Sequence, residues 1–235
     1  MSITQNQTAR LAGIVYLCLI ITGIFSLMYV PNQLIDWENA AKTVENIKGN
    51  LVLFKLSIVS GLLMALFFLT LSLVLYKLFH EVNRSQAAVL VLLVAISVTL
   101  SFSYTLHRFE ILALLEKPEQ ISSDILKSQL MSHLTSFNKG VQVNSIFWGL
   151  WLFPFGYLVF KSGFLPKFLG VFLMLGCAGY LVEFAGRLFI ENYYDTILSD
   201  MAGLPSQIGE FGICLWLIIF GARTFSFSKY LKRVS

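Results

Sequence analysis

The stretch LVLFKLSIVSGLLMALFFLTLSLVLY, residues 51–76, decides the fold class of this chain. It carries a single charged side chain, Lys55. An α-helix needs about 20 apolar residues to cross the hydrocarbon core of a bilayer, at about 1.5 Å of rise per residue. A transmembrane β-strand would instead alternate apolar and polar residues over about ten positions. The stretch does not alternate, so it predicts a membrane-spanning helix.

Five further apolar segments meet the same criterion of length and composition. Helices are expected because the bilayer offers no partner to unpaired backbone groups. The sequence therefore predicts an all-α polytopic membrane protein, a bundle of about six transmembrane helices that forms a single domain over residues 1–235. The predicted helices cover about 11–30, 51–76, 87–115, 141–160, 165–189 and 205–225.

The composition agrees with a membrane protein. Hydrophobic residues make up 57% of the chain and charged residues 13%, against about 25% charged residues in a soluble domain. The formal net charge of +4 lies in short segments that flank apolar runs, so the expected partner is the lipid bilayer and not a nucleic acid. Cys18, Cys177 and Cys214 lie inside apolar runs and show no spacing typical of a metal site. The first apolar run exceeds the length of the apolar region of a signal peptide, and no small-x-small cleavage site follows it before Pro31, which indicates an uncleaved helix.

Prolines mark several of the predicted helix ends. Pro31 is expected to close the first helix. Pro166 and Pro205 fit the first turns of the fifth and sixth helices, where a missing N–H matters little. Pro154 falls inside the fourth helix and should kink it, because it cannot bond to the Leu150 carbonyl.

Two connections on one side of the membrane predict short helices of their own. Residues 36–48 are expected to form a short surface helix. Residues 122–137 show apolar residues near helical spacing, and Ser123 or Asp124 can cap their start. This second segment is expected to lie on the outer interface or over the end of the bundle.

The distribution of Lys and Arg predicts that both termini are cytoplasmic. The inner side would carry Arg10, Lys77, Arg84, Lys161, Lys167, Arg223, Lys229, Lys232 and Arg233. The outer side would carry Lys42, Lys48, Lys117, Lys127 and Lys139. The expected location is the cell membrane, as a multi-pass protein of a bacterial inner or plasma membrane.

Ionisable side chains inside the predicted helices are the candidates for a functional site, since such groups usually face a bundle interior or a cavity. On the predicted topology they all lie within roughly 12 Å of the outer boundary, counted at 1.5 Å per residue. Asn144 begins the fourth helix at the same level. The candidate ligand-binding residues are Lys55, His107, Arg108, Glu110, Asn144, Glu183, Arg187 and Glu210.

Helical spacing groups several of these residues on common faces. Thr99, Ser103, His107 and Glu110 follow one another at steps of four, four and three residues, which places them on one face of a helix. Glu183 and Arg187 form an acid-then-base pair at i,i+4, the favoured order. His80 and His133 fall in predicted loops.

Three interpretations of this polar group remain open. It can be a structural network of ion pairs and hydrogen bonds without a ligand, in which Lys55 and Arg187 extend to the interface. It can be an outward-facing pocket that binds or transports a small polar molecule, an ion or a lipid headgroup. It can be an intramembrane metal-dependent hydrolase around His107, Glu110, Glu183 and Glu210, although zinc usually takes more His or Cys ligands.

No motif in the sequence assigns a catalytic residue, a metal or a cofactor. GxSxG, HExxH, a Walker loop and a GxGxxG motif after a strand are all absent from the sequence. A role as a membrane accessory subunit is the further possibility, and protein partners are not specified.

Four stretches resemble the bacterial membrane proteins grouped as domain of unknown function 4386. They are ARLAGIVYLCLIITGIF, LSLVLYKLFHEVNR, GYLVFKSGFLPKFLGVFLMLGCAGYLVEF and IGEFGICLWLIIFG. In similar sequences the position of Glu183 is often acidic, and Glu210 looks like part of the pattern. Such proteins often show a Leu-His-Gly stretch before the fourth helix, where this chain has LTSFNKG, and this departure weakens a metal site. The resemblance implies a membrane-embedded helical fold and no known activity, cofactor or substrate.

Overall fold

The computed structural model describes residues 3–116 and 122–223. Over these residues the chain is helical with short connections, and six helices are long and apolar enough to cross a membrane. The chain divides into two compact units. Unit 1 consists of Met1–Val15, Leu71–Val94 and Ile146–Ser235, and unit 2 of Tyr16–Thr70 and Ala95–Ser145. The single-domain organisation stays a prediction.

The first span is longer than expected. It begins as α1 (Ile3–Ile24), continues through a π-helical turn, η1 (Phe25–Tyr29), and ends as α2 (Val30–Leu34). Pro31 was expected to close this helix, and that prediction is wrong. A proline is tolerated in the first turn of a helix segment, where its missing N–H is not needed. The π-turn directly before α2 supplies that kind of position inside a continuous span.

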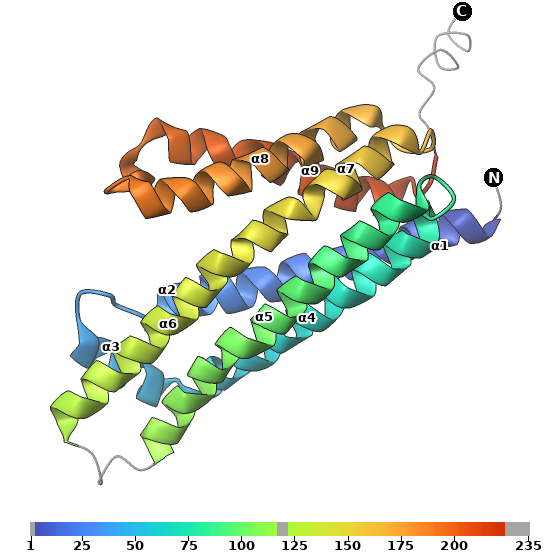
Figure 1. Cartoon of the computed structure of the whole chain (residues 1–235). Helices are drawn as coiled ribbons and strands as arrows, with labels where there is room; N and C mark the ends of the chain where they lie inside the picture. The colour runs from blue at the N-terminus through green and yellow to red at the C-terminus, as the bar shows by residue number, and fades with distance from the viewer. Residues whose placement is uncertain (1–2, 117–121, 224–235) are drawn as a thin grey trace, which may run out of the picture. The chain divides into compact units, whose positions relative to one another are not determined.

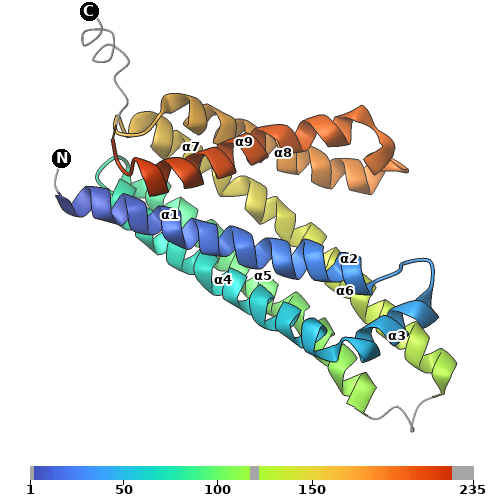
Figure 2. The ribbon, with the colours of Figure 1, turned by 180° about the vertical axis from the view of Figure 1, so that it is seen from behind.

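Two long helices, α4 (Leu51–Phe79) and α5 (Arg84–Glu116), run side by side through unit 2 in both views (Figures 1 and 2). The short helix α3 (Ala40–Gly49) precedes them. It confirms the short surface helix expected over residues 36–48, but residues 36–39 form a loop before it. Asn39 caps α3, since its side chain accepts a hydrogen bond from the Lys42 N–H. α3 buries Thr43, Val44 and Ile47 and exposes its opposite face, as an amphipathic surface helix should.

The fourth span differs most from the expectation. Helix α6 (Ser123–Leu150) is continuous, so residues 122–137 do not form a separate surface helix and the span does not begin near Val141. Leu130, Leu134 and Phe137 are buried, and the same helical face continues to Asn144, seven residues after Phe137. No proline interrupts this stretch. The cap is Ser122, whose hydroxyl accepts from the Ile125 N–H at 3.5 Å, and not Ser123 or Asp124.

The fourth span is interrupted near Pro154, as the sequence predicts. α6 ends at Leu150, Trp151 forms a turn, and α7 (Leu152–Lys161) follows. α7 and α8 (Lys167–Phe189) are neighbours in unit 1, as the short connection between them predicts. A Cβ on Gly156 would lie 2.5 Å from the Gly170 carbonyl oxygen. Glycine at this position therefore allows the two backbones to approach closely.

The last span begins earlier than expected. A short 3₁₀ turn, η3 (Tyr193–Asp195), leads into α9 (Ile197–Ile219), which packs against α8 (Figure 1). Pro205 lies inside α9 and not in its first turn, because helix formation starts after the extended residue Thr196. The helix ends before Gly221, which adopts a φ of +64°. The predicted end at Phe225 lies outside the described residues.

An apolar core lies at the end of unit 2 where α2, α3, the start of α4, the end of α5 and the start of α6 meet. Burying a side chain such as Leu or Ile contributes about 1.5–3 kcal/mol, so this cluster holds α3 against the long helices. Its buried members are Val30, Leu34, Val44, Ile47, Phe54, Ile58, Ile111, Leu126, Leu130 and Leu134.

Candidate functional site

Arg108 is buried in the interior of unit 2, with 3% of its surface exposed. One guanidinium nitrogen, Nη1, donates to the Ser26 hydroxyl at 3.0 Å and lies 3.3 Å from the Ser57 hydroxyl. The other, Nη2, donates to the Ser26 carbonyl at 3.0 Å. The guanidinium carbon lies 3.9 Å from the centre of the Phe137 ring, a cation–π contact. Arg108 on α5 therefore ties together η1, α4 and α6.

The π-turn explains why the Ser26 carbonyl is open to Arg108. In η1 the Val30 N–H bonds to the Phe25 carbonyl, five residues back. The corresponding donor for the Ser26 carbonyl would be residue 31, which is a proline without an N–H. A buried carbonyl without a donor is unfavourable, and Arg108 Nη2 supplies the donor.

The positive charge of Arg108 has no carboxylate partner among residues 3–116 and 122–223. The ion pairs in these ranges join Lys42 to Asp36, Lys127 to Asp124 and Arg187 to Glu183. Arg108 Nε also lacks a hydrogen-bond partner. Neutral oxygens and an aromatic face thus stabilise this guanidinium.

Asn144 lies at the α5–α6 contact and is completely buried. Its amide nitrogen donates to the Ser101 hydroxyl at 3.0 Å, and the Tyr104 hydroxyl lies 3.2 Å from the same oxygen. Tyr104 packs edge-on against Phe137, with 5.1 Å between ring centres. These contacts fix α5 against α6.

His107 contacts a residue that the sequence placed in a loop. His133 lies in α6, and its Nδ1 is 3.4 Å from Nδ1 of His107. Both rings are half-buried. The signal in the sequence was the helical spacing over residues 122–137, which already included position 133. The sequence did not predict the contact between His107 and His133, because this segment was expected to end before the fourth span.

Lys55 and Glu110 are exposed on α4 and α5, and no ion pair to either is found among the described residues. Thr99 and Ser103, which share the helix face of Glu110, are exposed as well. In unit 2 the structure therefore brings together Arg108 with its serines, Asn144 with Ser101, and His107 with His133.

The remaining candidates lie in unit 1. Glu183 and Arg187 form the ion pair that their i,i+4 spacing predicts, and the Arg187 guanidinium carbon lies 5.0 Å from the centre of the Tyr194 ring. The Tyr180 hydroxyl donates to Glu210 Oε1 at 3.4 Å, which links α8 to α9. The candidate residues divide between the two units, so one shared network of eight residues stays a prediction.

A pocket of about 550 Å³ opens between α3 and the start of α6 in unit 2. The sequence did not single it out, because its two sides lie about 80 residues apart. Val44 and Leu126 are 8% and 5% exposed and form an apolar floor. Around them lie Ala41, Glu45, Lys48, Gly49, Ser123 and Lys127.

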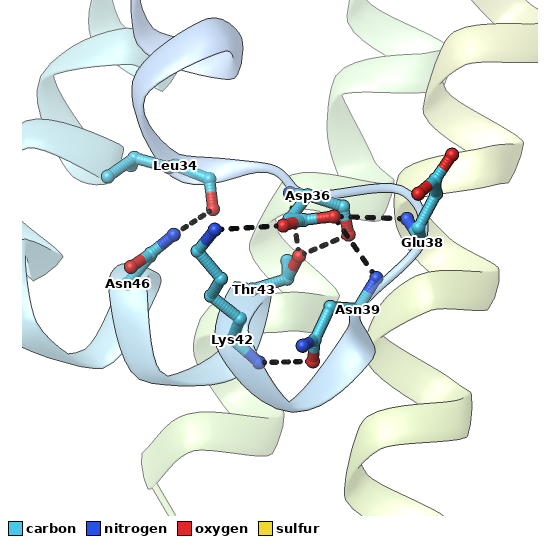
Figure 3. Close-up of polar contacts among 7 residues, drawn as sticks. All are labelled: Leu34, Asp36, Glu38, Asn39, Lys42, Thr43 and Asn46. Carbon is cyan, nitrogen blue, oxygen red and sulfur yellow. Dashed lines mark hydrogen bonds and ion pairs between the residues drawn. The ribbon is translucent and has the colours of Figure 1, made fainter.

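The position of α3 at this pocket depends on a polar loop between α2 and α3 (Figure 3). Asp36 accepts hydrogen bonds from the N–H groups of Glu38 and Asn39 at 3.2 and 3.1 Å, and from Lys42 Nζ at 3.1 Å. The hydrogen bond from Lys42 is the main cause that lowers the pKa of Asp36 below its ordinary value of 3.8. The Thr43 hydroxyl donates to the Asp36 carbonyl at 2.8 Å.

Residues 11–221 match the model of the family described as a domain of unknown function (DUF4386), and the chain belongs to this family. An uncharacterized protein of Archaeoglobus fulgidus is 33% identical over 90 residues. That match covers 38% of this chain and 51% of the relative, so it spans about half the relative's length. No solved structure matches the chain significantly. The family resemblance expected from the sequence is confirmed, and this relative is archaeal.

Proposed function

We propose that the protein is a multi-pass protein of the cell membrane that binds a small anion or the anionic headgroup of a lipid on the outer side. The pocket between α3 and α6 carries this proposal, since two lysines border an apolar floor there. Its volume of about 550 Å³ lies in the range of small-molecule sites, about 300–1,000 Å³. The proposed location is a bacterial inner or plasma membrane, with both termini in the cytoplasm.

Lys48 is the charge of the pocket that favours an anion, because Lys127 is paired with Asp124. Lys48 and Lys127 outnumber Glu45 among the lining residues. Lys127 contacts Asp124 at 3.2 Å, and Lys48 forms no ion pair with any described residue. A lysine ammonium binds phosphate as a point charge, and the apolar floor suits the first carbons of a lipid chain. A phosphate that carries the first carbons of a lipid chain therefore suits both the lysines and the apolar floor of the pocket.

For Arg108 and Asn144 the contacts favour a structural role over ligand binding. Arg108 donates to oxygens of two other helices and is almost inaccessible. The second candidate function is the binding of a polar ligand by the residues singled out in the sequence, and it would require the helices that carry them to open. These residues are His107, Arg108, Glu110, Asn144 and Lys55 in unit 2, or Glu183, Arg187 and Glu210 in unit 1.

The hydrolase alternative finds little support in the positions of its residues. A catalytic zinc usually takes three protein ligands. Within residues 3–116 and 122–223, no three His, Cys, Asp or Glu side chains converge on one point. A transport role and an accessory-subunit role remain compatible with binding in the α3–α6 pocket.

Thermal unfolding of the detergent-purified protein tests the proposal. Phosphatidylglycerol in mixed micelles, or inorganic phosphate, should raise the unfolding midpoint, because a ligand that binds only the folded state stabilises it. Phosphatidylcholine should have a smaller effect. A response to phosphatidylglycerol alone indicates a lipid headgroup, and a response to both indicates a free anion.

A double variant, Lys48→Gln with Lys127→Gln, should lose this response. Lys139→Gln is the matched control, because Lys139 is an exposed lysine of α6 that does not line the pocket. Equal responses in the double variant and the control would mean that the anion binds elsewhere, and a wild-type protein without any response would end the proposal.

A further inference from the structure

The imidazoles of His107 and His133 face each other across the contact of α5 with α6. Their Nδ1 atoms are 3.4 Å apart, and their ring centres are 5.6 Å apart. An imidazole nitrogen without a proton is a ligand for zinc, copper or nickel. Two such nitrogens from separate helices form the minimum of a chelating site.

The distance between the two nitrogens fits one metal ion. Zinc binds histidine nitrogens at about 2.0–2.1 Å, and two ligands of a tetrahedral ion then lie about 3.3 Å apart. The observed separation of 3.4 Å differs from that value by about a tenth of an ångström. With both lone pairs aimed at the ion, the ring centres would lie about 5.2 Å apart, so a small rotation of the rings about χ2 is sufficient.

Contacts that lie after His133 along α6 hold α5 and α6 together. Tyr104 packs against Phe137, and Ser101 bonds to Asn144. Gly140 allows the Tyr104 side chain to lie directly on the α6 backbone. Ligands on rigid elements lose little conformational freedom when a metal binds.

We propose that His107 and His133 form a two-nitrogen site for a divalent transition metal such as Zn²⁺. The two imidazoles are the protein ligands of this site, since no third His, Cys, Asp or Glu side chain of residues 3–116 and 122–223 converges on them. Both rings are partly open to solvent, and water completes the coordination. The site is independent of the α3–α6 pocket, which shares no residue with it.

Titration of the metal-free, detergent-purified full chain with ZnCl₂ tests the site. Zinc should raise the unfolding midpoint by roughly 5 °C when its concentration is about 100-fold above Kd. MgCl₂ should have no effect, because magnesium prefers oxygen ligands. The variants His107→Ala and His133→Ala should each lose the response.

His80→Ala is the control, since His80 lies outside this pair and is exposed. It should retain the full response to zinc. Isothermal titration, which does not depend on unfolding, should show one zinc per chain in the wild type and in His80→Ala. The proposal is overturned if the wild type binds no zinc, or if His107→Ala and His133→Ala bind it as the wild type does.

Discussion

Arg108 shows how a single charged side chain can be accommodated in a membrane-crossing helix. A guanidinium has five N–H donors in a planar fork, and here both terminal nitrogens find oxygens on neighbouring helices. The ring of Phe137 covers the cation at 3.9 Å. No other side chain combines that charge with that fork, so arginine is required at this position for geometry as well as for charge.

Replacing Arg108 with lysine should destabilise the protein by about 2–4 kcal/mol. One ammonium cannot reach both the Ser26 carbonyl and the Ser57 hydroxyl. A hydrogen bond to a charged group contributes about 1.5–3 kcal/mol. Denaturant unfolding in detergent measures the change. Arg84→Lys, an exposed arginine at the start of α5, should shift stability by less than about 0.5 kcal/mol. Equal losses in the two variants would contradict the role given to Arg108.

At Asp36 the expected effect depends on pH. The pKa of Asp36 is lowered in the folded protein, chiefly by the Lys42 hydrogen bond, so its stabilising contacts are complete above 3.8 and are lost as the pH falls through the folded value. Asp36→Ala, which removes the acceptor oxygens, should mimic that loss at neutral pH. Hydrogen exchange of the Glu38 and Asn39 amides should accelerate in the variant, and unchanged exchange would show that the carboxylate does not hold the loop.

At the scale of elements, the π-turn η1 is the feature that makes room for Arg108. It places Ser26 opposite Ser57, whose carbonyl accepts from the Ser26 hydroxyl at 2.8 Å. Gly61 on α4 allows this approach, since an added Cβ would lie 2.9 Å from the Ser26 hydroxyl oxygen. A π-turn, a proline and a glycine on two helices therefore cooperate to position one arginine.

The variant Pro31→Ala should reduce the dependence on Arg108. An N–H at position 31 can donate to the Ser26 carbonyl, or the turn can relax to an α-helix in which Val30 does so. In the Pro31→Ala background, Arg108→Lys should therefore cost about 1 kcal/mol less than in the wild type. A double-mutant cycle measures this coupling, and additivity within about 0.5 kcal/mol would show that the proline and the arginine act independently.

The type and number of the membrane-spanning helices could be predicted from the sequence, but several of their ends could not. Hydropathy reports the apolar middle of a helix, whereas α6 and α9 extend into polar residues whose helical state depends on packing. The prediction at Pro31 failed for a related reason. Whether a proline ends a helix depends on whether the backbone can place it in a first turn, and propensity alone does not reveal the π-turn.

At the scale of the whole molecule, the sequence identifies residues with an unusual environment, but it identifies a partner only within a single helix. Arg108 and Asn144 are buried, and Glu183 pairs with Arg187 as predicted. Arg108 forms no ion pair among the described residues, and serine oxygens that carry no charge accept its hydrogen bonds. The contacts of His107 and the α3–α6 pocket depend on residues distant in sequence, which helical spacing alone cannot bring together.

The α3–α6 pocket is expected to open on the outer side of the cell membrane. Thiol labelling in intact cells tests it most directly, in a background where Cys18, Cys177 and Cys214 are replaced by alanine. Lys48→Cys lies on the pocket, and Lys161→Cys, at the end of α7, is the control, because the Lys and Arg distribution predicts an inner position for Lys161. A membrane-impermeant maleimide should label Lys48→Cys in intact cells and Lys161→Cys only after permeabilisation. The reverse pattern would contradict the claim.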